Sequence, residues 1–111
     1  MPAAKIEPVE FSGRVLMVGC GSIGQATLPP LRRHLTLPAD GLTVLEASEQ
    51  GRALAAANQA KFVHCHLKPS TYVRELRRRL KSGDLLLNLS VDVSSLDLVE
   101  WCSEHGVLYV D

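Results

Sequence analysis

The sequence has few aromatic residues, no excess of either charge and no long hydrophobic run. Its 111 residues include one Trp, two Tyr and two Phe, and 12 Lys and Arg residues balance 12 Asp and Glu residues. A neutral chain that is poor in aromatic residues lacks the basic, stacking surface typical of nucleic-acid binding. No stretch approaches the roughly 20 apolar residues of a membrane-spanning helix. The composition therefore predicts neither a nucleic-acid partner nor a membrane partner.

Cysteine is also scarce, and its spacing suggests no pairing. Three cysteines, an odd number, are typical of a reducing compartment. The first residues lack the apolar core of a signal peptide, so we expect a cytoplasmic protein. The length suffices for one compact domain. We expect a polar N-terminal lead-in over residues 1–12 and a single domain over residues 13–111.

The periodicity of apolar residues predicts five strands that alternate with four helices. The expected strands are 15–18, 42–46, 61–64, 85–89 and 107–110, and the expected helices are 22–36, 50–59, 70–81 and 95–105. Pro29 and Pro30 predict a kink or an early end in the first helix, and Ser70 is expected to cap the third. This order, with right-handed crossovers, predicts an α/β fold, a Rossmann-like doubly wound parallel sheet of about five strands.

The junction after the first strand carries the strongest functional signal. The apolar run 15–18 leads directly into Gly19-x-Gly21-x-x-Gly24. In a dinucleotide-binding domain the first glycine permits a tight turn, and the second lets the backbone approach a pyrophosphate. The third glycine allows the next helix to lie close to the sheet. A helix that begins near Ser22 would direct its N–H groups and positive dipole end at the phosphates.

An acidic residue follows at the distance that this motif requires. Glu46 closes the apolar run 42–45, about 20 residues after Gly24, where a carboxylate hydrogen-bonds the adenosine ribose. A carboxylate there also repels the 2′-phosphate of NADP. Residues 47–49 offer no cation, and Arg52 comes only a turn later. The pattern favours NAD as the cofactor. The alternative is a solvated glutamate at the end of a strand.

Short polar side chains follow the fourth expected strand at the same edge of the sheet. Asn88, Ser90 and Asp92 leave this strand, and in such a fold the loop lies beside the nicotinamide half of the cofactor. A helix-capping loop, with Ser94 or Ser95 as the cap, is the alternative, and both interpretations can hold together.

Two other patterns point to chemistry that we do not expect. The triplet 64–66, His-Cys-His, has too few ligands for a metal site, because no second cluster with zinc spacing follows. The basic stretch 74–81 is explained by a solvated helix face, with nucleic-acid binding as the weaker alternative.

The chain resembles the bacterial homospermidine synthases, a branch of the saccharopine-dehydrogenase-like group. The most distinctive match is residues 88–97, Asn-Leu-Ser-Val-Asp-Val-Ser-Ser-Leu-Asp. The other matching stretches are residues 18–25, Leu28-Pro29, Arg33-His34, Glu46 and residues 106–111. The resemblance begins at Gly13 and covers nearly all of the chain, but only the N-terminal part of such an enzyme.

The resemblance implies an enzyme that retains NAD. Putrescine is oxidised, ammonia is lost, a second amine condenses, and the same cofactor returns the hydride to give homospermidine. A homodimer is implied for the full-length enzyme. Carried over by position, the pyrophosphate cradle is Gly19, Gly21, Ser22, Ile23 and Gly24; the ribose ligand is Glu46; and the nicotinamide side is lined by Asn88, Leu89, Ser90 and Asp92.

The resemblance also implies that the chain is a truncated piece. The segment that carries further acidic and aromatic residues of the amine pocket would follow Asp111, together with the substrate domain. We therefore assign no catalytic residue and expect this chain alone not to make homospermidine. Two alternatives remain open, namely the cofactor domain of another saccharopine-type NAD(P)-dependent dehydrogenase and a stand-alone nucleotide-sensing module.

Overall fold

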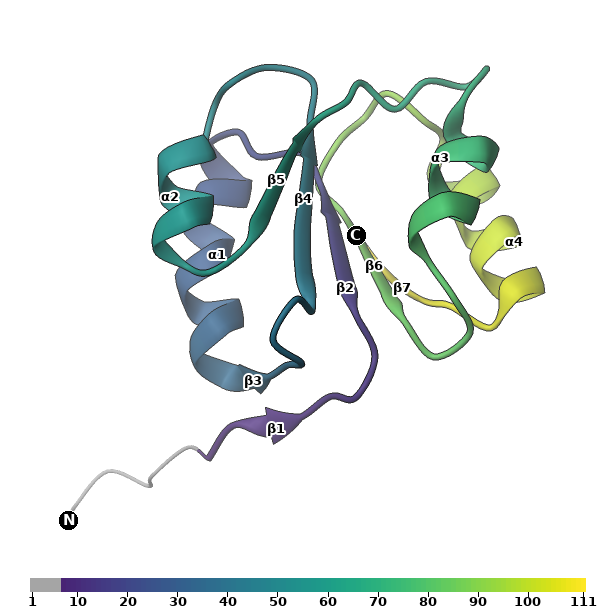
Figure 1. Cartoon of the computed structure of the whole chain (residues 1–111). Coiled ribbons are helices and arrows are strands. Elements are labelled where there is room, and N and C mark those ends of the chain that lie inside the picture. Colours follow the sequence, from purple (N-terminus) through teal and green to yellow (C-terminus); the bar gives the residue numbers. More distant parts are fainter. Residues whose placement is uncertain (1–6) are drawn as a thin grey trace, which may run out of the picture.

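The computed structural model describes residues 7–111 and contains a parallel sheet of five strands (Figure 1). The strands of this sheet are β2 (Val15–Val18), β4 (Leu42–Glu46), β5 (Lys61–His64), β6 (Leu85–Asn88) and β7 (Leu108–Val110). Their order is β5-β4-β2-β6-β7, and every neighbouring pair is parallel. Strand β2 therefore lies in the centre of the sheet, and the later strands are added on both sides of it.

Four helices cover the two faces of the sheet. They are α1 (Ser22–His34), α2 (Arg52–Ala57), α3 (Tyr72–Arg79) and α4 (Ser95–His105). Helices α1 and α2 lie on one side of the sheet and α3 and α4 on the other (Figure 1). None of these helices in residues 7–111 is long and apolar enough to cross a membrane. The arrangement confirms the predicted doubly wound, Rossmann-like architecture.

The central strand is buried on both faces because its four residues are all apolar. Leu16 and Val18 pack into the core under α3 and α4, whereas Val15 and Met17 pack into the core under α1 and α2. This alternation follows from the period of two in a strand. Met17 is fully buried, so the strand that leads into the glycine motif is held rigidly from both sides.

Two prolines do not end the first helix. Pro29 and Pro30 lie inside α1, which continues to His34, so the prediction of an early end was wrong. The proline φ is compatible with a helix, although each proline removes an N–H donor and its ring crowds the preceding turn. The helix ends at His34, two residues before the predicted end, because Leu35–Thr36 forms the short strand β3. This strand pairs with β1 (Val9–Glu10), which lies in the stretch that we predict as a polar lead-in.

Helix caps differ between the two helices on the second face. The prediction that Ser70 caps α3 was wrong, because the N-cap residue of this helix is Thr71. The Ser94 hydroxyl accepts a 3.2 Å hydrogen bond from the Asp97 N–H and so caps α4. Gly106 ends the same helix in the left-handed conformation, with φ of 69°.

Helix α4 offers a test of the core on this face. Leu98 is completely buried, whereas Leu96 on the same helix is 67% exposed. We predict that Leu98→Ala lowers the free energy of unfolding by about 2–5 kcal/mol, because it removes buried methyl groups and leaves a cavity. Leu96→Ala serves as the control, with a change of about 0.5 kcal/mol or less. Urea unfolding measures both, and equal losses would contradict the assigned packing.

Candidate functional site

Three segments that lie far apart in the sequence meet at the carboxyl edge of the sheet. Val18, the last residue of β2, is aligned with Leu45 on one side and Asn88 on the other. The Gly19 N–H donates to the Leu45 carbonyl at 2.8 Å, so the pairing continues into the glycine loop. The glycine loop, the end of β4 and the loop after β6 are therefore neighbours. This edge is where ligands bind in doubly wound sheets.

Two of the three glycines of the loop are required by close backbone contacts. Gly19 has φ of 96°, and a Cβ on it would lie 3.1 Å from the Leu89 carbonyl group. A Cβ on Gly24 would lie only 2.7 Å from the Gly19 carbonyl oxygen, which confirms that α1 approaches the loop closely. A Cβ on Gly21 would meet only the Gln50 amide oxygen, at 3.7 Å. No backbone atom therefore approaches the position of a Cβ on Gly21 within 4 Å.

The first turn of α1, which follows Gly21, has no compensating charge. Gly21 is the N-cap and has no side chain, and the first turn contains no acidic residue. Ser22 is exposed, and the Ile23 side chain is 71% exposed. The N–H groups of such a turn carry partial positive charge and suit a bound phosphate.

Glu46 extends from the end of β4 to the glycine loop. Its Oε1 accepts a 2.9 Å hydrogen bond from the Cys20 N–H. Its Oε2 accepts from the Ser48 N–H at 2.6 Å and from the Ser48 hydroxyl at 2.5 Å. A carboxylate has about four acceptor positions, so one remains for a ribose hydroxyl. The glutamate is therefore a bound part of the loop rather than a freely solvated side chain.

The surroundings of Glu46 keep it ionised. Burial acts to raise its pKa, but hydrogen bonds from Ser48 and Cys20 and the nearby His64 outweigh this effect and lower the pKa below the usual value. A permanent negative charge at this position repels a second negative charge.

Arg52, the first arginine after Glu46 in the sequence, contacts other side chains. The Arg52 Nε donates to the Glu49 carboxylate at 2.5 Å, and its guanidinium carbon lies 4.5 Å from the centre of the Phe62 ring. His64 lies 3.3 Å from the same glutamate and contacts the Ala47 carbonyl at 2.8 Å. These contacts lie in the loop after β4, and the side chains of the Arg52–Glu49 pair are both more than half exposed.

The loop after β6 is ordered by its own side chains. The Asn88 Oδ1 accepts from the Ser90 N–H at 3.2 Å, and its amide nitrogen donates to the Tyr109 hydroxyl at 3.2 Å. The Ser90 hydroxyl donates to the Asp92 carboxylate at 3.0 Å. His66, from the segment after β5, lies 3.3 Å from that carboxylate. Both side chains are 46% exposed, so this pair faces solvent at the site.

Several residues of the site were missed by sequence reasoning. Ser48, His66 and Tyr109 each contact a predicted site residue, but none lies in the glycine motif or at the expected acidic position. The alternation of His64, at the end of β5, with His66 is the one signal in the sequence, and by itself it suggests a metal site rather than ion pairs. In the structure each histidine pairs with a carboxylate of a different loop.

Cys20 packs within the glycine loop and is fully buried. Burial, and secondarily the charge of Glu46, raises the pKa of its thiol, so the thiol stays protonated at neutral pH. A Cβ on Gly51, which has φ of 80°, would lie 2.3 Å from the Cys20 sulfur. The cysteine is therefore a packing residue between two loops.

A parallel doubly wound sheet, a glycine loop at a free helix N-terminus and an ionised strand-end carboxylate together define a dinucleotide-binding Rossmann domain. Comparison with known proteins agrees. The chain belongs to the family described as the saccharopine dehydrogenase NADP binding domain, which matches residues 15–111.

Two relatives and one solved structure share the same name. The homospermidine synthase of Blastochloris viridis is 38% identical over 91% of this chain, and that of Mesorhizobium japonicum is 37% identical over 92%. The crystal structure of homospermidine synthase from Legionella pneumophila, in complex with NAD, matches with a TM-score of 0.85 and 25% identity over 92% of the chain. The chain spans 22% of the length of each of these proteins.

The hydrogen bonds of Glu46 predict a pH-dependent stability. Because its pKa is lowered in the folded state, the stabilisation is present above the unfolded pKa and is lost as pH falls through the folded value. We predict that Glu46→Gln is less stable than the parent chain at neutral pH, and that the difference shrinks as the pH falls below about 5. Urea unfolding at a series of pH values measures this.

The control for this experiment is Glu104→Gln, at an exposed position on α4. We expect its stability to follow that of the parent chain across the whole pH range. A difference between Glu46→Gln and the parent that stays constant with pH would show that the Glu46 charge does not contribute.

Proposed function

We propose that this chain is the NAD-binding portion of a homospermidine synthase. The enzyme would convert putrescine to homospermidine with release of ammonia, as the resemblance at residues 88–97 implies. The observation that carries the proposal is the meeting of the glycine loop, Glu46 and the Asn88–Asp92 loop at one edge of the sheet. The two relatives of 37% and 38% identity bear the same name, and the solved homospermidine synthase holds NAD.

The cofactor in our proposal is NAD rather than NADP, although the family description names NADP. Two features of this chain support the choice. The ionised Glu46 would lie at the ribose hydroxyls, and Arg52 is held by Glu49 and Phe62. A 2′-phosphate would therefore meet the Glu46 charge, and Arg52 could approach the phosphate only by leaving Glu49.

Each part of the site has a role in this proposal. When bound, NAD would accept a hydride in its oxidised form and donate it again in its reduced form. The N–H groups of residues 21–24 bind the pyrophosphate, and Glu46 orients the ribose. Asn88, Leu89 and Ser90 line the nicotinamide side. Asp92, a half-exposed carboxylate beside His66, attracts the protonated amine of the substrate. The chain's contribution is thus to bind and orient cofactor and amine.

Two other functions are compatible with this fold, and they differ from the proposed function in the ligand that they require. A saccharopine-type dehydrogenase would bind an amino acid, whose carboxylate requires a cation at the nicotinamide side. A stand-alone nucleotide sensor would bind its nucleotide tightly without a second domain. Among residues 88–92 the side chains are neutral or acidic, which favours an amine over an amino acid.

The cofactor preference can be measured directly on the chain. We predict that the chain binds NAD about tenfold or more tightly than NADP, because Glu46 repels the additional phosphate. Glu46→Gln removes the charge and should narrow this ratio toward one, whereas Glu104→Gln should leave it unchanged. Calorimetric titration with both dinucleotides gives the ratio. A preference for NADP in the parent chain would overturn the assignment of Glu46.

The enzyme assignment is tested by exchange into a relative. The segment of the Blastochloris viridis enzyme that matches this chain is replaced by the chain, and homospermidine is measured after incubation with putrescine and NAD. We predict that the chimera is active, and that Asp92→Asn in the chimera raises KM for putrescine more than it lowers kcat, because it removes a charge that attracts the amine. A chimera that folds and binds NAD but makes no homospermidine would contradict the proposal.

A further inference from the structure

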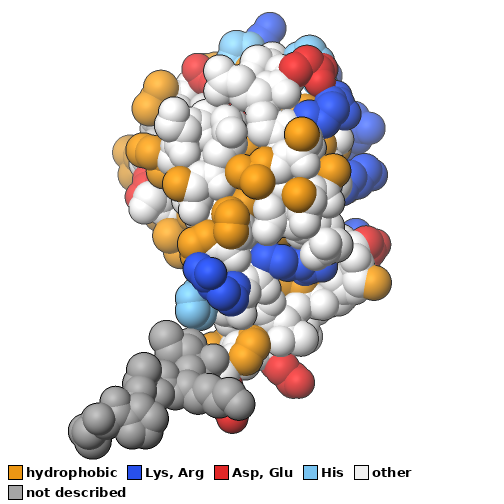
Figure 2. All heavy atoms as spheres, turned by 90° about the vertical axis from the view of Figure 1, so that its left-hand side faces the viewer, with side chains coloured by type: hydrophobic (Ala, Val, Ile, Leu, Met, Phe, Trp, Pro, Cys, Tyr) orange, Lys and Arg blue, Asp and Glu red, His pale blue; other side chains and the backbone are white. Residues whose placement is uncertain are grey.

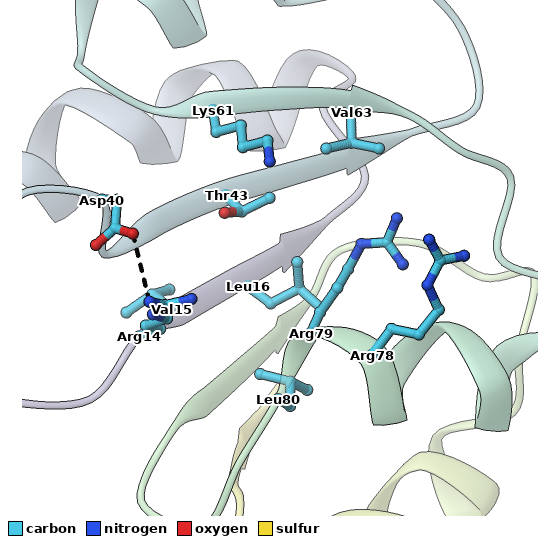
Figure 3. A pocket seen from close by; sticks show the side chains of 10 residues that line it. All are labelled: Arg14, Val15, Leu16, Asp40, Thr43, Lys61, Val63, Arg78, Arg79 and Leu80. Carbon is cyan, nitrogen blue, oxygen red and sulfur yellow. Dashed lines mark hydrogen bonds and ion pairs between the residues drawn. The ribbon is translucent and has the colours of Figure 1, made fainter.

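A concave surface lies at the edge of the sheet opposite the glycine loop. It is a groove of about 300 Å³ lined by the first residues of β2 and β5 and by the C-terminal end of α3 (Figure 3). We call it the basic groove. Because the strands are parallel, their starting ends lie at the edge away from the dinucleotide site. The groove therefore lies apart from the dinucleotide site.

The rim of the basic groove is rich in positive charge. Its lining includes four cationic side chains, Arg14, Lys61, Arg78 and Arg79, and a single carboxylate, Asp40. These cations come from three separate parts of the chain, so their gathering is a property of the fold. Figure 2, which faces the side of the molecule covered by α1 and α2, shows Lys and Arg side chains along its right-hand margin and others lower on the molecule. The chain as a whole is neutral, which makes this local excess distinctive.

Only part of this charge is neutralised within the chain. The Arg79 guanidinium donates to the Glu75 carboxylate, which is buried and has a lowered pKa chiefly because of that bond. Arg14 lies 3.3 Å from Asp40, but both side chains are more than half exposed. Arg78 is 65% exposed and lies 3.7 Å from Glu75, which it shares with two other arginines. Exposed pairs of this kind are weak and easily exchanged for other partners.

Lys61 adds a cation at the outer edge of the sheet. It is exposed and begins β5, the terminal strand in the order of the sheet. Figure 3 shows the Lys61 side chain above Thr43, with Val63 farther along the same strand. Strand β5 pairs only with β4 in the described sheet, so its outer backbone groups are available to another segment.

The shape and floor of the groove favour an extended ligand. Figure 3 places the Arg14–Asp40 pair at one end and the side chains of Arg78 and Arg79 toward the other. The floor between them includes the half-buried Val63 and Thr43, beside the buried Leu16 and Leu80. Cations spread along a mostly apolar floor suit a segment that alternates carboxylates with apolar side chains better than they suit one compact anion. The described lining contains no aromatic residue, so it offers no platform for stacked bases.

We propose that the basic groove binds an extended, acidic polypeptide segment of a partner. Carboxylates of the segment pair with Lys61 and Arg78, and its apolar side chains contact the floor. The charge complementarity of the rim carries this proposal. It does not depend on the identity of the enzyme or on the dinucleotide site.

The probe for this test is a fluorescein-labelled peptide of about ten residues in which glutamate alternates with leucine and serine. We expect saturable binding, measured by fluorescence anisotropy, that weakens as salt is added. The double variant Lys61→Gln/Arg78→Gln should lose about tenfold or more in affinity. The matched control is Arg33→Gln/Lys68→Gln, which removes two exposed cations outside the groove and should bind like the parent chain.

Further arms of the experiment decide between ligand classes. Both double variants change exposed side chains, and equal thermal unfolding by circular dichroism shows that they fold alike. A peptide with glutamine in place of glutamate should not bind, and NAD should not compete. Equal binding of the parent and the groove variant would overturn the proposal. So would displacement of the peptide by inorganic pyrophosphate, or tighter binding of a single-stranded oligonucleotide than of the acidic peptide.

Discussion

The shared register of β2 with both of its neighbours is the constraint on which the site depends. Val18 is aligned with Leu45 and with Asn88, so the residues that follow these three positions lie at one level. A slip of one residue would turn Glu46 to the opposite face of the sheet and away from the Cys20 N–H. The buried side chains of β2 prevent such a slip, because each face of the strand fits a separate core.

Much of this arrangement could be predicted from the sequence because the fold is built from parallel strands. Strands β2, β4 and β5 have the predicted limits, since apolar runs bounded by glycine, proline or charged residues leave little freedom in their ends. Once these strands are parallel and ordered, the residues after each of them must meet at one edge. The glycine loop, Glu46 and Asn88 were therefore predictable as neighbours without any knowledge of side-chain contacts.

The other side-chain contacts of the site depend on the paths of loops, which no local sequence pattern specifies. His66 reaches Asp92 only because the segment after β5 crosses toward α3, and Tyr109 reaches Asn88 only because β7 lies beside β6. The continuation of α1 through Pro29 and Pro30 shows a different limit. A local preference to break a helix is overcome when packing on both sides of the prolines, as at the buried Leu28, holds the segment in place.

The contact between Cys20 and Gly51 couples two loops that differ in sequence position by about thirty residues. The cysteine sulfur fills the space that any side chain at position 51 would need. A side chain at position 51 therefore requires a smaller residue at position 20, and it must also tolerate the left-handed backbone conformation of Gly51. Transfer of the glycine loop between relatives would succeed only when the segment that precedes α2 is transferred with it.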